Sequence, residues 1–280
     1  MEDKVRSPIV AGMFYPADPS ALRDTVNLLL ESAPPLSSVD AERESLALIV
    51  PHAGYIYSGP VAAAGYAYAK SHGTPNRVII LGANHSGFGA PVSLAGDDAW
   101  RTPLGDLPLD TGFIRRLADA GFAIDDAAFV NEHSVEVQVP FVQVLWGRTV
   151  PLVPICIRPH SLEALVHLGQ ALAAASSDTS TLIVASSDFT HYEPDDVARA
   201  RDHGALQFIL SLDVTRFHTH CIENRLSICG VGAITATMEL ACALGLTDTQ
   251  LLSYATSGDT SGEHSAVVGY AAVAFEGASE

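Results

Sequence analysis

In residues 46–59, LALIVPHAGYIYSG, a run of apolar residues ends in a loop that carries His52. The same arrangement recurs twice: RVIILGANHSG at 77–87, with His85, and TLIVASSDFTHY at 181–192, with His191. Short apolar runs rich in Val, Ile and Leu predict buried strands. Ligands of α/β proteins bind beyond the carboxyl ends of such strands. The three histidine loops are therefore predicted to converge on one pocket.

Helical patterns separate the apolar runs, and strands that alternate with helices are typical of a layered α/β fold. Asp18 caps the first predicted helix, and Pro19 fits its first turn. The apolar residues within 135–146 fit the periodicity of a strand and also that of a helix, and we favour a helix there. The other predicted elements are helices over 61–70, 110–120, 161–175 and two or three within 195–244, and strands over 150–157, 249–255 and 266–275. We expect one α/β domain over residues 1–280, a central mixed sheet flanked by helices, and a mobile loop over 32–45.

The composition excludes several classes of protein. The 280 residues are 48% hydrophobic and 17% charged, with a formal net charge of −17, which argues against a disordered chain. So acidic a surface repels phosphate groups, and we expect neither nucleic acid nor a membrane as partner. No apolar run approaches the roughly 20 residues that span a bilayer, and the first residues lack a secretory-signal pattern. We expect a cytoplasmic protein whose cysteines are reduced thiols: Cys156, Cys221, Cys229 and Cys242.

His52 and His85 are candidate metal ligands. Neutral imidazole nitrogens suit iron, zinc, copper or nickel. Three glycines close to these histidines, Gly54, Gly82 and Gly87, would let the backbone turn tightly beside a ligand. The alternative is a pair of loop histidines that bond only to backbone groups.

Cys229 precedes a helical run that begins after two glycines, in ICGVGA. A thiolate at the amino end of a helix is stabilised by the helix dipole, so Cys229 is a candidate metal ligand or reactive thiol. The alternative is a small buried apolar side chain. Asp188 could orient an imidazole or hold a water behind the ligands, or cap the next turn. His191 could act as a general acid or base, since imidazole ordinarily titrates near neutrality.

Three further residues are assigned to the pocket lining: His133, Tyr55 and Asp259. His133 lies in NEHSVE between two glutamates, and could line the pocket or pair with a carboxylate. Asp259 could form a rim of the pocket or belong to a turn before the last strand. Signatures for dinucleotides, for the P-loop, for a serine-hydrolase elbow and for HExxH zinc proteins do not occur in the sequence. Nucleotide-dependent chemistry and serine hydrolysis therefore lose support.

Seven ordered motifs together resemble the Memo family, which in prokaryotes is also called protein B of the AmmeMemoRadiSam system. The motifs are VPHAGYIYSGPVAA at 50–63, LGANHSG at 81–87, RTPLGDL at 101–107, NEHSVEVQVPF at 131–141, SSDFTHY at 186–192, ICGVGA at 228–233 and SYATSGD at 253–259. The resemblance starts with SPIVAGMFYP at 7–16 and extends to the last predicted strand, so it covers almost the whole chain.

The Memo family in turn resembles the catalytic subunit of class III extradiol dioxygenases, which use non-haem iron in an α/β fold. This resemblance implies metal ligands at His52, His85 and Cys229, and an acid/base residue at His191 with Asp188 beside it. The dioxygenases complete their site with a carboxylate. A thiolate is softer and more easily oxidised, and it favours Cu(I), zinc or a different iron chemistry. Catechol cleavage therefore does not carry over with the fold.

Three functions follow as hypotheses. The first is a metal-dependent oxidoreductase of dioxygenase-like fold, with Fe(II) favoured over copper and copper over zinc. The second is a non-catalytic binding or accessory protein that recognises a peptide, a metal or a partner protein. The third is zinc-dependent hydrolysis. We expect a small molecule or peptide as ligand, and the family name implies a functional link to a radical-SAM protein and an AMMECR-type protein.

Overall fold

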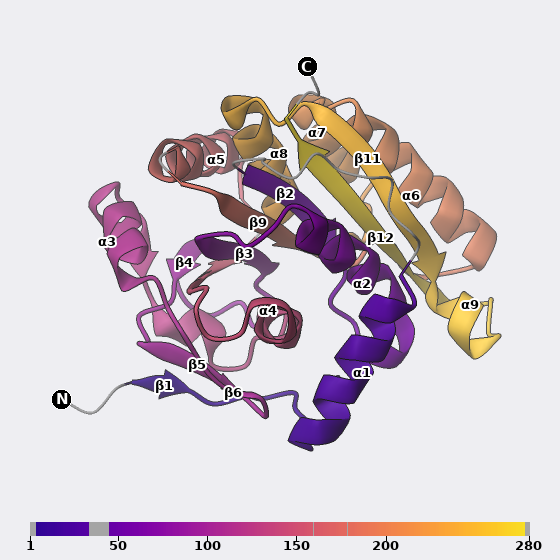
Figure 1. Ribbon diagram of the computed structural model, residues 1–280. Coiled ribbons are helices and arrows are strands. Elements are labelled where there is room, and N and C mark those ends of the chain that lie inside the picture. The colour runs from indigo at the N-terminus through magenta and orange to yellow at the C-terminus, as the bar shows by residue number, and fades with distance from the viewer. Residues whose placement is uncertain (1–3, 34–44, 159, 178, 278–280) are drawn as a thin grey trace.

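The computed structural model describes four parts of the chain: residues 4–33, 45–158, 160–177 and 179–277. The mobile loop predicted over 32–45 lies outside these parts, except for its first two residues and its last. The main sheet contains β2 (Ser45–Val50), β3 (Arg77–Ala83), β4 (Val92–Leu94), β7 (Ala123–Ile124), β8 (Leu152–Ile157), β9 (Thr181–Ser186), β10 (His191–Glu193), β11 (Asp248–Thr256) and β12 (Val267–Glu276). Their order is β10-β12-β2-β9-β3-β8-β4-β7, and β11 also pairs with β12. Parallel and antiparallel pairs both occur, so the predicted central mixed sheet is confirmed (Figure 1).

The three histidine loops leave neighbouring strands. β2, β9 and β3 lie side by side in the sheet and run parallel. Val50 pairs with Ser186, and Ser186 pairs with Gly82, so the carboxyl ends of the three strands are in register. Nearly every residue of these strands is buried, which explains why each strand is an uninterrupted apolar run in the sequence. The loops therefore begin side by side, as the sequence predicts.

Helices cover both faces of the sheet (Figure 1). They are α1 (Pro19–Glu31), α2 (Tyr55–Ser71), α3 (Thr111–Asp119), α4 (Val139–Trp146), α5 (Leu162–Ser176), α6 (Asp195–Leu210), α7 (Val214–Glu223), α8 (Val231–Leu244) and α9 (Ser257–Ser261), with 3-10 turns η1 (Asp126–Phe129) and η2 (Glu136–Gln138). On one face, α8 packs against β2, β3 and β9, and α5 packs on α8. On the other face, α2 packs against β2 and β12, and α1 and α4 pack on α2. Within the described ranges, no helix has both the length and the apolar character needed to cross a membrane.

The helix predicted over 61–70 begins earlier than expected. α2 starts at Tyr55, directly after its N-cap Gly54, and contains Pro60. Proline lacks the N–H that would bond to the carbonyl four residues back, so a proline in the sequence predicts a helix start. Pro60 is the sixth residue of α2, so the carbonyl of Ile56 lacks its helical partner there, and the helix nevertheless continues to Ser71. The other ambiguous segment, 135–146, is helical from Glu136 onward, as we favoured.

The sequence does not predict a second, smaller sheet. It consists of β1 (Val5–Arg6), β5 (Ala99–Thr102) and β6 (Gly105–Pro108), in the order β1-β5-β6. Strands of two to four residues are too short to show a recognisable alternation of apolar and polar residues. Arg6 of β1 lies over the Trp100 ring, 4.3 Å from its centre. This contact joins the amino-terminal strand to its neighbour β5.

Gly82 is needed for close packing and not for the turn suggested by the sequence. It lies inside β3, and a Cβ atom there would lie 2.7 Å from Val135 Cγ2 and would overlap Ser134 Oγ. We expect Gly82→Ala to lower the free energy of unfolding by about 1–3 kcal/mol, because overpacking a closed contact forces its neighbours to move. Urea unfolding measures this loss. Gly112→Ala is the matched control, since a Cβ at Gly112 in α3 meets only Asp110 Oδ1 at 3.5 Å; equal losses in both variants would contradict the prediction.

Candidate metal centre

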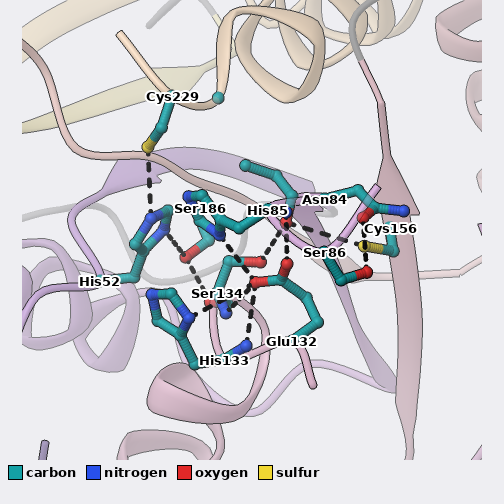
Figure 2. A network of polar contacts seen from close by, with 12 residues as sticks. His52, Asn84, His85, Ser86, Glu132, His133, Ser134, Cys156, Ser186 and Cys229 are labelled. Atoms are coloured by element: carbon teal, nitrogen blue, oxygen red, sulfur yellow. Dashed lines mark hydrogen bonds and ion pairs between the residues drawn. The ribbon is translucent and has the colours of Figure 1, made fainter. Parts of the chain in front are cut away.

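His52, His85 and Cys229 come together at the carboxyl ends of the parallel strands. Each of the three residues offers one ligand atom, and these atoms all lie within 4.8 Å of one another. Cys229 Sγ is 3.2 Å from His52 Nε2 (Figure 2). His52 follows β2, His85 follows β3, and Cys229 directly precedes Gly230, the N-cap of α8. Three separate segments of the chain thus supply two nitrogens and one sulfur to one point.

The orientation of the His52 ring follows from the hydrogen bonds of Ser186. Ser186 Oγ donates its one hydrogen to the Ser134 carbonyl at 2.6 Å. It must therefore act as acceptor for His52 Nδ1 at 3.1 Å and for Gln138 Nε2 at 2.8 Å. His52 carries its hydrogen on Nδ1, and the lone pair of Nε2 points toward Cys229. Burial, and secondarily the nearby His85, lower the pKa of His52 to about 3, so the ring is neutral.

Cys229 behaves differently from the expected stabilised thiolate. Burial, together with the Asp188 carboxylate, raises the pKa of its thiol, and this outweighs the backbone N–H of Asp188, which donates to Sγ at 3.3 Å. A helix amino terminus therefore does not ionise Cys229 without further positive charge. A metal cation supplies such charge, because a coordinating thiol loses its proton. Metal binding at this group would therefore remove the Cys229 proton.

Asp188 and His191 lie beside the three candidate ligands. Asp188 Oδ1 accepts a hydrogen bond from the backbone N–H of His52 at 2.7 Å, so Asp188 holds the His52 loop and not an imidazole ring. Burial raises the pKa of the Asp188 carboxyl. His191 Nδ1 donates to the Ser227 carbonyl at 2.8 Å, which leaves Nε2 as the atom that can accept or donate a proton.

The three residues predicted to line the pocket lie in different places. The His133 ring stacks on His85 with 4.8 Å between ring centres and meets His52 edge-on at 5.5 Å; burial lowers the pKa of His133 to about 4. Tyr55 lies deeper, and its hydroxyl donates to the Val137 carbonyl at 2.7 Å. Asp259 pairs with Arg199 at 2.7 Å, and its carboxylate accepts the backbone N–H of Thr256, the N-cap of α9, at 2.8 Å. The structure thus brings His133 to the candidate ligands, whereas the contacts of Tyr55 and Asp259 are with other groups.

Glu132, the residue before His133, also belongs to the site, although the sequence gives no signal for it beyond that position. With His85 and His133 it forms a second group whose ligand atoms lie within 4.8 Å of one another. Its carboxylate already accepts four hydrogen bonds: from His85 N at 2.5 Å, His85 Nδ1 at 2.9 Å, His133 N at 2.9 Å and Ser134 N at 2.8 Å. Although burial opposes ionisation, these bonds hold the pKa of Glu132 down at about 2. These four donors use most of the acceptor capacity of the carboxylate, so the group with Cys229 is the better candidate metal site.

Two histidines and a cysteine gathered beyond the parallel strands of an α/β sheet define a candidate metalloprotein. A family model described as Memo-like protein matches residues 6–274, and the chain belongs to the Memo family. The fold and the ordered motifs agree with that assignment.

Curated relatives extend over nearly the whole chain. A MEMO1 family protein of Methanopyrus kandleri is 43% identical over 96% of this chain and 98% of its own. MEMO1 family proteins of Desulfurococcus amylolyticus and Nitrosopumilus maritimus are 42% and 38% identical, each over 97% of this chain and 99% of their own. Among solved structures, an uncharacterized protein of Escherichia coli K12 superposes with a TM-score of 0.52 over 82% of this chain and 99% of its own. Its sequence identity is 12%, so this likeness concerns the fold alone.

Proposed function

We propose that this protein binds a redox-active metal ion through His52, His85 and Cys229 and is an oxidoreductase of dioxygenase-like fold. The observation that carries the proposal is the approach of the three ligand atoms to within 4.8 Å of one another. Neutral imidazole and thiolate are ligands for iron, copper and zinc. We favour Fe(II), then copper, with zinc third, because the family resembles iron enzymes and the thiolate suits Cu(I).

A bound iron or copper ion would supply the one-electron chemistry that amino-acid side chains lack. The residues of the chain would position a small molecule or peptide and move its protons. His191 suits the role of general acid or base, since Nδ1 is held by the Ser227 carbonyl and Nε2 is left to exchange a proton. Asp188 would support the centre by holding the backbone of His52 in place.

We expect His191→Ala to lower oxygen-dependent turnover by about 10²-fold, the lower end of what a general acid or base contributes. The protein is loaded anaerobically with Fe(II) or Cu(I), and oxygen uptake is then followed with catechols and a panel of small metabolites. The metal content of the variant should equal that of the wild type, because His191 is outside the ligand group. His203→Ala, an exposed histidine of α6, is the control and should leave uptake unchanged. Uptake by the loaded wild type no greater than that of free metal would instead favour a non-catalytic binding or accessory role.

A further inference from the structure

We propose that Glu132 is a positioning residue of the metal centre: its carboxylate holds the Nδ1–H of His85, so that Nε2 of His85 is the atom that binds the metal. The inference rests on the proposed function, because it assigns a role within the same site. It adds a residue from a different segment of the chain to those that determine metal affinity.

The geometry of Glu132 determines which nitrogen of His85 carries the hydrogen. An ionised carboxylate can only accept hydrogen bonds, and three backbone N–H groups already point at it, those of His85, His133 and Ser134. His85 Nδ1, 2.9 Å from Glu132 Oε1, is therefore the donor of the fourth bond. The side chain of Glu132 is fully buried, so water does not compete for these bonds. With its hydrogen on Nδ1, a neutral His85 presents a lone pair only at Nε2.

Other contacts keep Glu132 from moving away with the loop that carries it. Arg6 Nη2 donates to the Glu132 carbonyl at 2.7 Å, and Arg6 Nε donates to the Phe129 carbonyl at 3.1 Å. Ser134 Oγ donates to the carbonyl of Ala83 at 2.8 Å, two residues before His85. The loop is thus bonded both to the amino-terminal strand and to the end of β3. His85 and its carboxylate are held in one arrangement by the backbone on both sides.

The two histidine ligands therefore differ in their support. The His52 Nδ1–H donates to a neutral hydroxyl, that of Ser186, whereas the His85 Nδ1–H donates to a charged carboxylate. A carboxylate partner fixes the tautomer of a ligating histidine and makes the other nitrogen a stronger donor; losing such a partner typically weakens metal affinity by 10–100-fold. We expect Glu132 to contribute an effect of this size.

The test compares Glu132→Gln with a matched variant, Glu276→Gln. Glu276 is also a largely buried carboxylate bonded to a histidine, with Oε2 2.9 Å from His72 Nε2. Glu276 is the last residue of β12. The residue before it, Phe275, pairs with Ala47 near the start of β2, whereas His52 follows the other end of β2. Fe(II) affinity is measured anaerobically by competition with a chromophoric chelator. We expect about a 10–100-fold loss for Glu132→Gln, and an affinity within about threefold of wild type for Glu276→Gln.

A second measurement uses the metal-free wild type and does not depend on any variant. Proton–nitrogen correlation spectra of the imidazole rings at pH 8 should show the His85 hydrogen on Nδ1. A neutral His85 ring with its hydrogen on Nε2 and none on Nδ1 would overturn the inference, as would a Glu132→Gln affinity equal to wild type or an equal loss in both variants. Wild-type protein that binds no Fe(II) would count against the proposed function, whereas the spectrum would still decide the orientation of His85. If Glu132→Gln fails to fold, the wild-type spectrum alone decides between support and rejection.

Discussion

Replacing both His52 and Cys229 by alanine is expected to lower the affinity for Fe(II) or copper by about 10⁴-fold. Structural zinc sites with four ligands bind with about 10–16 kcal/mol, or roughly 3 kcal/mol for each ligand. Two lost ligands then cost about 6 kcal/mol, and every 1.4 kcal/mol is a factor of ten. The nearest nitrogen–sulfur pair of the site, His52 Nε2 and Cys229 Sγ, is removed by this double variant. Purified protein should therefore lose its metal.

Metal content is measured by mass spectrometry on protein purified anaerobically with a reductant, since oxidation of Cys229 would itself empty the site. Cys242→Ala is the matched control, because Cys242 is an exposed thiol on α8 outside the ligand group. The control should keep the wild-type metal content. Near-stoichiometric metal in the double variant would contradict this prediction and would indicate that the metal binds to the group formed by His85, Glu132 and His133.

Glu136→Ala is expected to lower the free energy of unfolding by about 3–5 kcal/mol, the usual cost of leaving a buried charge without its partner. The Glu136 carboxylate accepts hydrogen bonds from the Arg6 guanidinium at 2.8 Å, from the Tyr15 hydroxyl at 2.8 Å and from the N–H groups of Ile9 and Val10 at 3.0 Å. The side chains of Arg6 and Glu136 are 9% and 1% exposed, so water cannot replace the lost partner. One carboxylate thus accepts hydrogen bonds from four different residues of the amino-terminal segment.

Urea unfolding of the metal-free protein measures this change without a contribution from metal binding. Glu193→Ala removes the carboxylate of an ion pair with Arg201 whose side chains are 34% and 40% exposed. Exposed pairs contribute about 0–1 kcal/mol, so the control should stay within that range. A loss below 1 kcal/mol for Glu136→Ala would show that the amino-terminal segment is held mainly by apolar packing.

The sequence predicts the parts of the fold that repeat one physical pattern over several residues. β2, β3 and β9 are buried on both faces and are therefore continuous apolar runs, which can be recognised without neighbours. The short strands β1, β5 and β6 offer no such pattern, since two to four residues cannot show periodicity. Their pairing depends on contacts such as that of Arg6 with Trp100, between residues far apart in the chain.

Two of the candidate ligands could be proposed from the sequence because their position is also visible in a few consecutive residues. His52 and His85 each follow an apolar run, and loops at the ends of parallel strands lie at one edge of a sheet. For Cys229, position before a helix allowed two interpretations, and the resemblance to the Memo family favoured metal binding. The roles of Ser186 and Glu132 have no comparable signal in the sequence. Glu132 stands 47 residues from His85, and nothing at either position indicates that the two meet.

The order of apolar runs, turns and histidine loops is enough to specify an α/β sheet with a candidate site at one edge, because burial and strand direction follow from local pattern. Hydrogen-bond partners do not follow from local pattern. They depend on how the loop at 129–136 folds back against β3, and so on Arg6, Glu136 and the missing Cβ of Gly82. The tautomers of His52 and His85 are set by hydrogen bonds between distant segments, and these bonds exist only after the chain has packed.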